Sequence, residues 1–168
     1  MKVIIPLREI GYEARKFEIK IPPEEIDYSG EYEVLGEYEI ILTLQKTDVG
    51  HKIRVEGKVP MRFVCSRCLD RFDRDFYFSD ENILRKGVDE VERLGDLDVE
   101  TWVIDKDEVD VIPIIRDILI VSLPINPICS EDCLGICPVC GEKMVGEPHK
   151  HEVKGVKLGD IIASAKRR

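Results

Sequence analysis

Six cysteines at short, regular spacings are the feature that most restricts how this chain can fold. Two pairs have two residues between the cysteines, CSRC at 65–68 and CPVCG at 137–141. Structural zinc sites usually take four sulfur or imidazole ligands, supplied as two such pairs. The sequence therefore predicts one or two structural Zn²⁺ ions. The candidate ligands are Cys65, Cys68, Cys129, Cys133, Cys137, Cys140, His149 and His151.

Eight ligands can be divided between two sites in more than one way. A site within the C-terminal segment closes only a short loop, which costs little entropy, and a site that joins distant pairs ties that segment to the rest of the chain. This favours Cys65 and Cys68 with Cys129 and Cys133, and Cys137 and Cys140 with His149 and His151. A rival division places the two CxxC pairs in one site. A single site with both histidines free also stays open.

Other roles for the cysteines are less favoured. No positively charged start leads into a long apolar run, so we expect a soluble, cytoplasmic protein with no membrane span. In the cytoplasm, cysteines bind metal more often than they form disulfides. The chain has one Gln and two Asn beside many Glu and Lys, a composition expected of a thermophile protein. Because hyperthermophile cytosols tolerate disulfides, that alternative stays open. A redox CxxC should open a helix, whereas Cys65 and Cys68 lie between two predicted strands.

Apolar residues at every second position predict an antiparallel sheet. The first series is Tyr38, Ile40, Leu42 and Leu44, and a turn at 47–50 separates it from a second series that runs from Ile53 to Phe63. A third strand is predicted at Arg71–Ser79, so that Cys65 and Cys68 lie in the loop between the second and third strands. A further strand is predicted at Lys16–Pro22, with Ile4 and Ile5 as a candidate partner.

The segment from 82 to 125 predicts an acidic excursion, a short strand and one helix. The apolar residues of Asn82–Asp98 show little periodicity, so this stretch should be exposed, part helix and part loop. Val99–Ile104 should be a strand that contains Trp102. A mostly buried apolar helix is predicted at 111–123, capped by Asp110, with Pro113 in its first turn and Pro124 after its end. A last short helix is predicted at 160–166.

Together these elements predict an α+β fold. We expect an antiparallel β-meander sheet or partial barrel with one buried apolar helix and a C-terminal zinc-knuckle extension. The predicted division is a β-rich core domain at 1–125, which includes the helix, and a Cys/His-rich zinc-binding extension at 126–168 packed on the core.

Charge is unevenly distributed along the chain. The net charge is −9, and residues 70–110 alone hold fifteen Asp or Glu against six Lys or Arg. From Gly141 onward the chain holds seven Lys or Arg against four Asp or Glu, a net charge of +3. Cations near zinc knuckles can contact RNA phosphates. The candidate RNA-binding residues are Arg67, Lys143, Lys150, Lys154, Lys157, Lys166, Arg167 and Arg168.

Enzyme activity is not predicted. Catalytic zinc needs an open coordination position, whereas this many soft ligands indicate closed sites. The chain has no HExxH motif, nucleophile elbow, phosphate loop or dinucleotide fingerprint. No small-molecule substrate is expected.

The order of these motifs resembles the YceD-like family of large ribosomal RNA accumulation proteins. The likeness is carried by CSRCLDRF at 65–72, by DVIPIIRDILIVSLPINPICSEDCLGICPVCGEKM at 110–144 and by the closing LGDIIASAKR. The resemblance implies a non-enzymatic factor that is needed for normal levels of large-subunit ribosomal RNA, and hence for ribosome assembly. The metal ligands vary among members of that family.

Two functional hypotheses follow. The first is a zinc-stapled factor that binds ribosomal RNA or a pre-ribosomal particle, with basic ribosomal proteins as a further partner of its acidic segment. The second is a protein–protein interaction module in which zinc is purely structural and no RNA is contacted. Charge reversal at Lys154, Lys157 and 166–168 separates them, because only the first predicts a loss of RNA binding.

Overall fold

The computed structural model describes residues 2–28, 30, 32–87, 101–104, 106–146 and 151. Most of the regular structure in these ranges is β-strand, and one α-helix lies among them. The predicted α+β class is therefore confirmed. No helix in the described ranges is long and apolar enough to cross a membrane.

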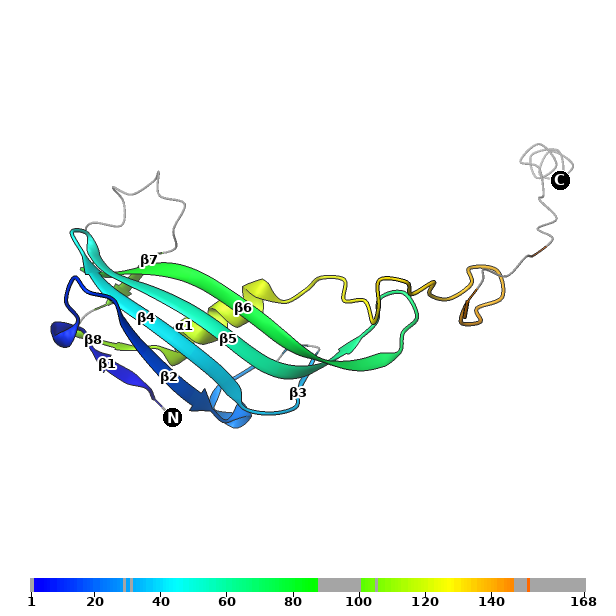
Figure 1. The fold of residues 1–168 in the computed structure, drawn as a ribbon, viewed down its shortest axis with the longest axis horizontal. Coiled ribbons are helices and arrows are strands. Elements are labelled where there is room, and N and C mark those ends of the chain that lie inside the picture. Colours follow the sequence, from blue (N-terminus) through cyan, green and yellow to red (C-terminus); the bar gives the residue numbers. More distant parts are fainter. Residues whose placement is uncertain are drawn as a thin grey trace, which may run out of the picture.

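The larger sheet is built around a long hairpin (Figure 1). Its strands lie in the order β2, β4, β5, β6 and β7, with β3 also paired to β5. Neighbours are antiparallel except β7, which runs parallel to β6, so the sheet is not wholly antiparallel. The strands are β2 (Arg15–Ile21), β3 (Glu33–Val34), β4 (Tyr38–Thr47), β5 (Gly50–Val64), β6 (Arg71–Lys86) and β7 (Thr101–Ile104).

The alternation in the sequence places one face of this sheet in the core. Ile40 lies opposite Gly57, and Leu42 lies opposite Val55, in the register between β4 and β5. All four are buried. Gly57 belongs to the apolar series because the Phe78 ring of β6 covers it. A Cβ added at position 57 would lie 2.2 Å from that ring. The apolar residues at every second position of the sequence are therefore the residues that face the core.

A smaller sheet corrects one prediction. β1 (Ile4–Pro6) pairs with β8 (Glu108–Asp110), and not with β2 as the sequence suggested for Ile4 and Ile5. Two short 3₁₀ helices, η1 (Leu7–Glu9) and η2 (Pro23–Glu25), join the N-terminal elements. Pairing of the two ends of the core across more than 100 residues is a long-range contact that local sequence patterns do not specify.

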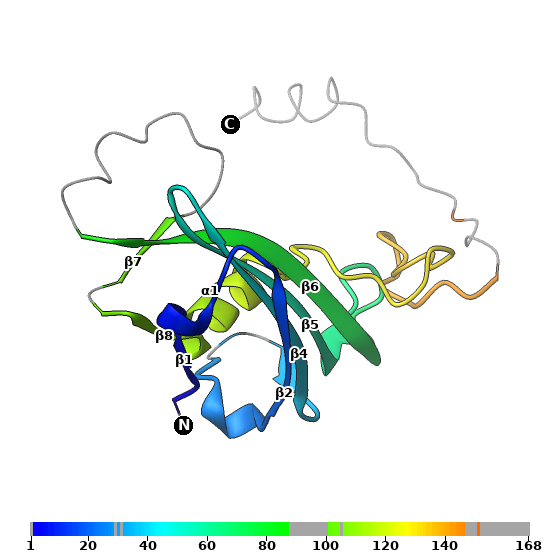
Figure 2. The same cartoon turned by 60° about the vertical axis from the view of Figure 1, so that its left-hand side comes forward.

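The helix α1 (Ile112–Ser122) lies against the concave face of the curved sheet (Figure 2). Its ends are within one residue of the predicted 111–123. Ile114, Ile115, Ile118 and Leu119 are buried, and they recur at the spacing of one helix face. The backbone N-cap is Val111, one residue later than predicted, although the Asp110 carboxylate accepts a hydrogen bond from the N–H of Ile112 at 3.2 Å.

The predicted acidic excursion begins too early. Asn82–Lys86 belongs to β6, and the Asn82 side chain is fully buried. The short strand that holds Trp102 is confirmed as β7, with Trp102 packed against the core. The remainder of the excursion at 88–98, like the predicted helix at 160–166, lies outside the described residues.

Candidate metal centre

The loop that joins β5 to β6 is a tight knuckle that directs two cysteines to one side. The N–H of Cys65 donates to the carbonyl of Asp70 at 2.8 Å, and the N–H of Leu69 donates to the carbonyl of Cys65 at 2.9 Å. Leu69 has a φ of 61°, in the left-handed region that closes such a turn. Cys65 and Cys68 are both buried by the chain that packs on this loop.

The second CxxC motif forms the same turn. The N–H of Cys137 donates to the carbonyl of Glu142 at 2.8 Å, and the N–H of Gly141 donates to the carbonyl of Cys137 at 2.9 Å. Gly141 has a φ of 75° at the position equivalent to Leu69. The two motifs therefore share a local structure as well as a spacing, and this is the turn that presents two sulfurs to one metal ion.

The C-terminal segment packs directly on the tip of the β5–β6 hairpin. The N–H of Ser66 donates to the carbonyl of Pro127 at 2.8 Å, and the N–H of Ile136 donates to the carbonyl of Arg67 at 3.1 Å. Gly135 lies so close that a Cβ there would stand 2.8 Å from the Arg67 carbonyl oxygen. These contacts bring Cys129 and Cys133 to the first knuckle.

Four sulfurs meet at this point. The ligand atoms of Cys65, Cys68, Cys129 and Cys133 all lie within 4.8 Å of one another. The Sγ atoms of Cys65 and Cys133 are 3.8 Å apart, and those of Cys68 and Cys129 are 3.7 Å apart. Tetrahedral zinc with bonds of about 2.3 Å separates its sulfurs by roughly 3.8 Å, whereas a disulfide bond is about 2.05 Å. The cluster therefore fits a zinc ion, and none of its four cysteines forms a disulfide.

Backbone groups tune the first cluster toward metal binding. Burial raises the pKa of the Cys65 thiol, but N–H groups of Cys68, Cys129 and Arg67 donate to its sulfur and hold that pKa well below its usual range. The N–H of Cys129 lies 3.4 Å from this sulfur. At Cys68 the Asp70 N–H lowers the pKa, but burial and the three neighbouring sulfurs outweigh it and raise the pKa. A bound cation would replace the protons that these sulfurs compete for.

Two arginines clamp the segment that carries Cys129 and Cys133. Arg74 Nη2 donates to the carbonyls of Ile128 and Cys129, both at 3.2 Å. Arg67 Nη1 donates to the carbonyls of Glu131 at 3.3 Å and Cys133 at 3.0 Å. Four thiolates around Zn²⁺ carry a net charge of −2, which nearby guanidinium groups offset. Arg74 was not predicted, because nothing in the sequence distinguishes it from its neighbour Arg71.

A second cluster holds three of its four predicted ligands. The ligand atoms of Cys137, Cys140 and His151 lie within 4.8 Å of one another, and Cys137 Sγ is 3.1 Å from His151 Nε2. Backbone N–H groups of Cys140 and Val139 lower the pKa of Cys137. His149 lies outside the described residues. The two CxxC pairs fall in different clusters, as in the favoured division and unlike the rival one.

Two of the predicted RNA-binding cations can be placed. The Arg67 guanidinium is exposed but bonded to the carbonyls named above. Lys143 forms an ion pair with Asp70, which joins the second knuckle to the first. The other candidates, Lys150, Lys154, Lys157, Lys166, Arg167 and Arg168, lie outside the described residues.

A known protein family matches more than half of the chain. Residues 52–158 match the family described as large ribosomal RNA subunit accumulation protein YceD. The chain belongs to the YceD family. The match includes both knuckles and the helix between them. The family name implies a role in the accumulation of the large ribosomal RNA.

Curated relatives match over a shorter stretch. Uncharacterized proteins Mb2951c of Mycobacterium bovis and Rv2926c of Mycobacterium tuberculosis are each 49% identical over 41 residues. That stretch is 24% of this chain and 19% of each relative, so the chain spans about a fifth of the length of the curated relatives it matches. No solved structure matches the chain.

Proposed function

We propose that this YceD-family protein supports large-subunit ribosomal RNA accumulation, and hence ribosome assembly, by binding ribosomal RNA or a pre-ribosomal particle. It acts without catalysis, through a basic surface that structural zinc holds at the tip of the β5–β6 hairpin. The convergence of four sulfurs at tetrahedral spacing supports this proposal, because it joins Cys129 and Cys133, near the start of the proposed C-terminal extension, to the loop between β5 and β6.

Zinc in this proposal is a structural element. Cys65, Cys68, Cys129 and Cys133 would hold one ion, and four protein ligands leave no position for a substrate. A second ion would be held by Cys137, Cys140 and His151, with His149 as the fourth ligand. When bound, zinc supplies folding free energy that the short extension cannot gain from an apolar core of its own.

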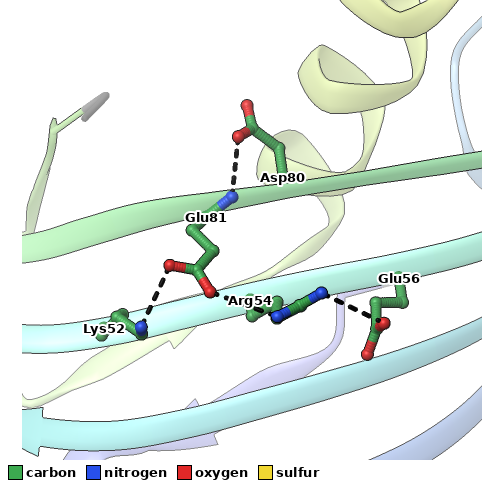
Figure 3. A network of polar contacts seen from close by, with 5 residues as sticks. All are labelled: Lys52, Arg54, Glu56, Asp80 and Glu81. Atoms are coloured by element: carbon green, nitrogen blue, oxygen red, sulfur yellow. Dashed lines mark hydrogen bonds and ion pairs between the residues drawn. The ribbon is translucent and has the colours of Figure 1, made fainter. Parts of the chain in front are cut away.

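The outer face of the sheet is a poor alternative for RNA, because the Lys and Arg side chains of its central strand β5 are paired with carboxylates. Lys52 and Arg54 of β5 both point toward Glu81 of β6 (Figure 3), and their side-chain nitrogens lie 3.0 and 3.5 Å from its carboxylate oxygens. Arg54 also lies 3.6 Å from Glu56, and Lys58 lies 2.9 Å from Asp75. Phosphate contacts need cations in excess. The excess of positive charge in the sequence lies after Gly141.

The test is RNA binding by zinc-loaded, full-length protein. We expect it to bind a transcribed large-subunit ribosomal RNA, with an affinity that falls steeply as salt rises. Changing Lys166, Arg167 and Arg168 to Glu should weaken binding and flatten the salt dependence. The matched control changes Lys2, Arg15 and Lys16 to Glu, an equal charge reversal at exposed positions of the core. Equal loss in both variants, or no binding by the wild type, would contradict the proposal.

A further inference from the structure

A hollow of about 530 Å³ lies at the end of the larger sheet that is opposite the knuckles. It is lined by residues of η1, of the turn between β4 and β5, and of the ends of β6 and β7. β5 starts beside this hollow at Gly50 and ends at Val64, next to the first knuckle, so the length of the strand separates the two places (Figure 1). The hollow is therefore not part of the candidate metal centre.

Arg85 of β6 lines this hollow and carries a buried charge that no carboxylate offsets. Arg85 is 8% exposed, and its Nε is buried with no hydrogen-bond partner in the described part of the chain. Among the described residues, the one carboxylate that lines the hollow is Asp107, which pairs with Arg8 at 2.7 Å and with Lys86. Arginine cannot lose its proton in a protein, and a buried charge is costly unless it is paired and hydrogen-bonded. An anion beside Arg85 would supply both the charge and the hydrogen-bond acceptors.

The backbone holds Arg85 in place. Arg85 is paired with Val103 in the register between β6 and β7, and the turn between β4 and β5 packs against it. A Cβ added at Gly50 would lie 2.3 Å from the Leu84 carbonyl oxygen and 3.4 Å from Arg85 Cγ, and Gly50 has a φ of 142°, which favours glycine. Because strand pairing and this close contact both restrain Arg85, its side chain needs little ordering when it binds a ligand.

The other charges of the hollow are mostly positive. Lys46 is exposed and lines the hollow, with its Nζ 5.5 Å from the centre of the Tyr12 ring and no carboxylate partner in the described ranges. Counted together, four Lys or Arg side chains and one Asp line the hollow, a net charge of +3. Burial lowers the pKa of His51, which also lines it, and the charges of Lys46 and Lys86 lower that pKa further. A multiply charged anion would offset this excess of positive charge.

A phosphate group fits these surroundings better than a carboxylate. A phosphate carries a charge of about −1.5 to −2 at pH 7 and three acceptor oxygens, and a guanidinium can donate two parallel N–H bonds to it. We propose that the hollow binds a phosphate group through Arg85, with the ammonium of Lys46 as a second contact. The volume of the hollow lies within the range of about 300 to 1,000 Å³ for small-molecule sites, which leaves room for the rest of a phosphorylated molecule beside Leu7 and Val49. This inference does not depend on RNA binding by the C-terminal residues.

The test uses zinc-loaded, isotope-labelled, full-length protein, titrated with adenosine monophosphate at constant ionic strength and followed by nitrogen–proton NMR spectra. The signals of the Arg85 Nε–H group and of the Gly50 and His51 backbone N–H groups should shift. Inorganic phosphate should shift the same signals, whereas adenosine, which has no phosphate, should shift none of them. The absence of any shift with both phosphate compounds would overturn the proposal.

Variants measure the contribution of each cation to the affinity for adenosine monophosphate. Arg85→Met should lower this affinity at least about tenfold, because hydrogen bonds between charged groups are lost. The matched control is Arg71→Met, which should leave it unchanged, because Arg71 lies at the other end of β6 and does not line the hollow. Lys46→Gln, at an exposed position, should give a smaller loss without removing a buried side chain. Equal affinities in Arg85→Met and Arg71→Met would contradict the proposed site.

Transcribed large-subunit ribosomal RNA distinguishes two sources of the phosphate. Equal RNA affinity in wild type and Arg85→Met would identify the ligand as a small phosphorylated molecule, and a loss in Arg85→Met would identify it as an RNA phosphate; the site stands in both cases. Changing Lys166, Arg167 and Arg168 to Glu should leave the affinity for adenosine monophosphate unchanged, so this test can succeed even if the proposed RNA binding fails. A loss of that affinity would place the phosphate on the C-terminal residues and overturn the inference.

Discussion

Arg74 in β6 and Cys129 in the C-terminal segment are 55 positions apart in the sequence, and a 3.2 Å hydrogen bond joins Arg74 Nη2 to the Cys129 carbonyl. The guanidinium therefore bonds the backbone of a candidate metal ligand and not its sulfur. Groups of this kind orient the ligands of a metal site and are needed for its full affinity.

Changing Arg74 to Ala should weaken zinc binding at the first cluster by about tenfold, within the range seen when outer-shell partners of a metal site are removed. Competition with a chromophoric chelator measures this affinity. Arg71→Ala is the matched control, because Arg71 is also exposed at the start of β6 but makes no such contact with the 127–133 segment among the described residues. Equal affinities in the two variants would show that Arg74 only covers the cluster.

Removing zinc should release the C-terminal segment and leave the sheet folded. The core residues, such as Leu42, Ile53 and Ile115, are buried without any contribution from the knuckles. Chelation should therefore increase amide exchange at Ser66 and Ile136, whose N–H groups bond across the contact, while exchange within β4 stays slow. Hydrogen exchange measured by mass spectrometry distinguishes this from unfolding of the whole chain. Global loss of protection would mean that the metal stabilises the core as well.

The sequence predicted the central strands and the helix because their periodicity is local. It could not predict the full length of β6, since Asn82, Arg85 and Lys86 are polar and follow acidic residues. Asn82 is nevertheless buried, by long-range packing. Pairing of β1 with β8 was missed for the same reason. The cysteine groupings could be predicted from loop closure, whereas the contacts of Arg67 and Arg74 are with backbone carbonyls, for which side-chain identity gives no signal.

Gly57 should not accept a larger side chain. A Cβ at this position would lie 2.2 Å from the Phe78 ring, and both residues face the core, where the ring has little room to move. Gly57→Ala should lower the free energy of unfolding by about 1–3 kcal/mol, the usual cost of overpacking, as measured by urea denaturation. Gly11→Ala, which meets no atom within 4 Å, should change it by less than about 0.5 kcal/mol. In a Phe78→Leu background the cost of Gly57→Ala should fall, and an undiminished cost would rule out the ring contact as its cause.

Tyr38 should make the stability of the core sensitive to alkaline pH. Burial, with a smaller contribution from Tyr28, raises the pKa of Tyr38 to about 12, from about 10 in an unfolded chain. Because the neutral phenol is the form that the folded core favours, its contribution is complete below pH 10 and is lost as the pH rises toward 12. The Tyr38 hydroxyl has no hydrogen-bond partner among the described residues, so Tyr38→Phe should be neutral or slightly stabilising at pH 7.

The measurement is the free energy of unfolding of wild type and Tyr38→Phe between pH 7 and pH 12. Tyr38→Phe should gain on wild type above pH 10, because phenylalanine has no proton to lose on unfolding. Tyr77→Phe is the control, since Tyr77 is 67% exposed and its substitution should change the free energy of unfolding by less than about 0.5 kcal/mol at pH 7. If the difference between Tyr38→Phe and wild type did not change with pH, the Tyr38 hydroxyl would have to reach solvent or a partner in the folded protein, and its burial would not be the cause of alkaline unfolding.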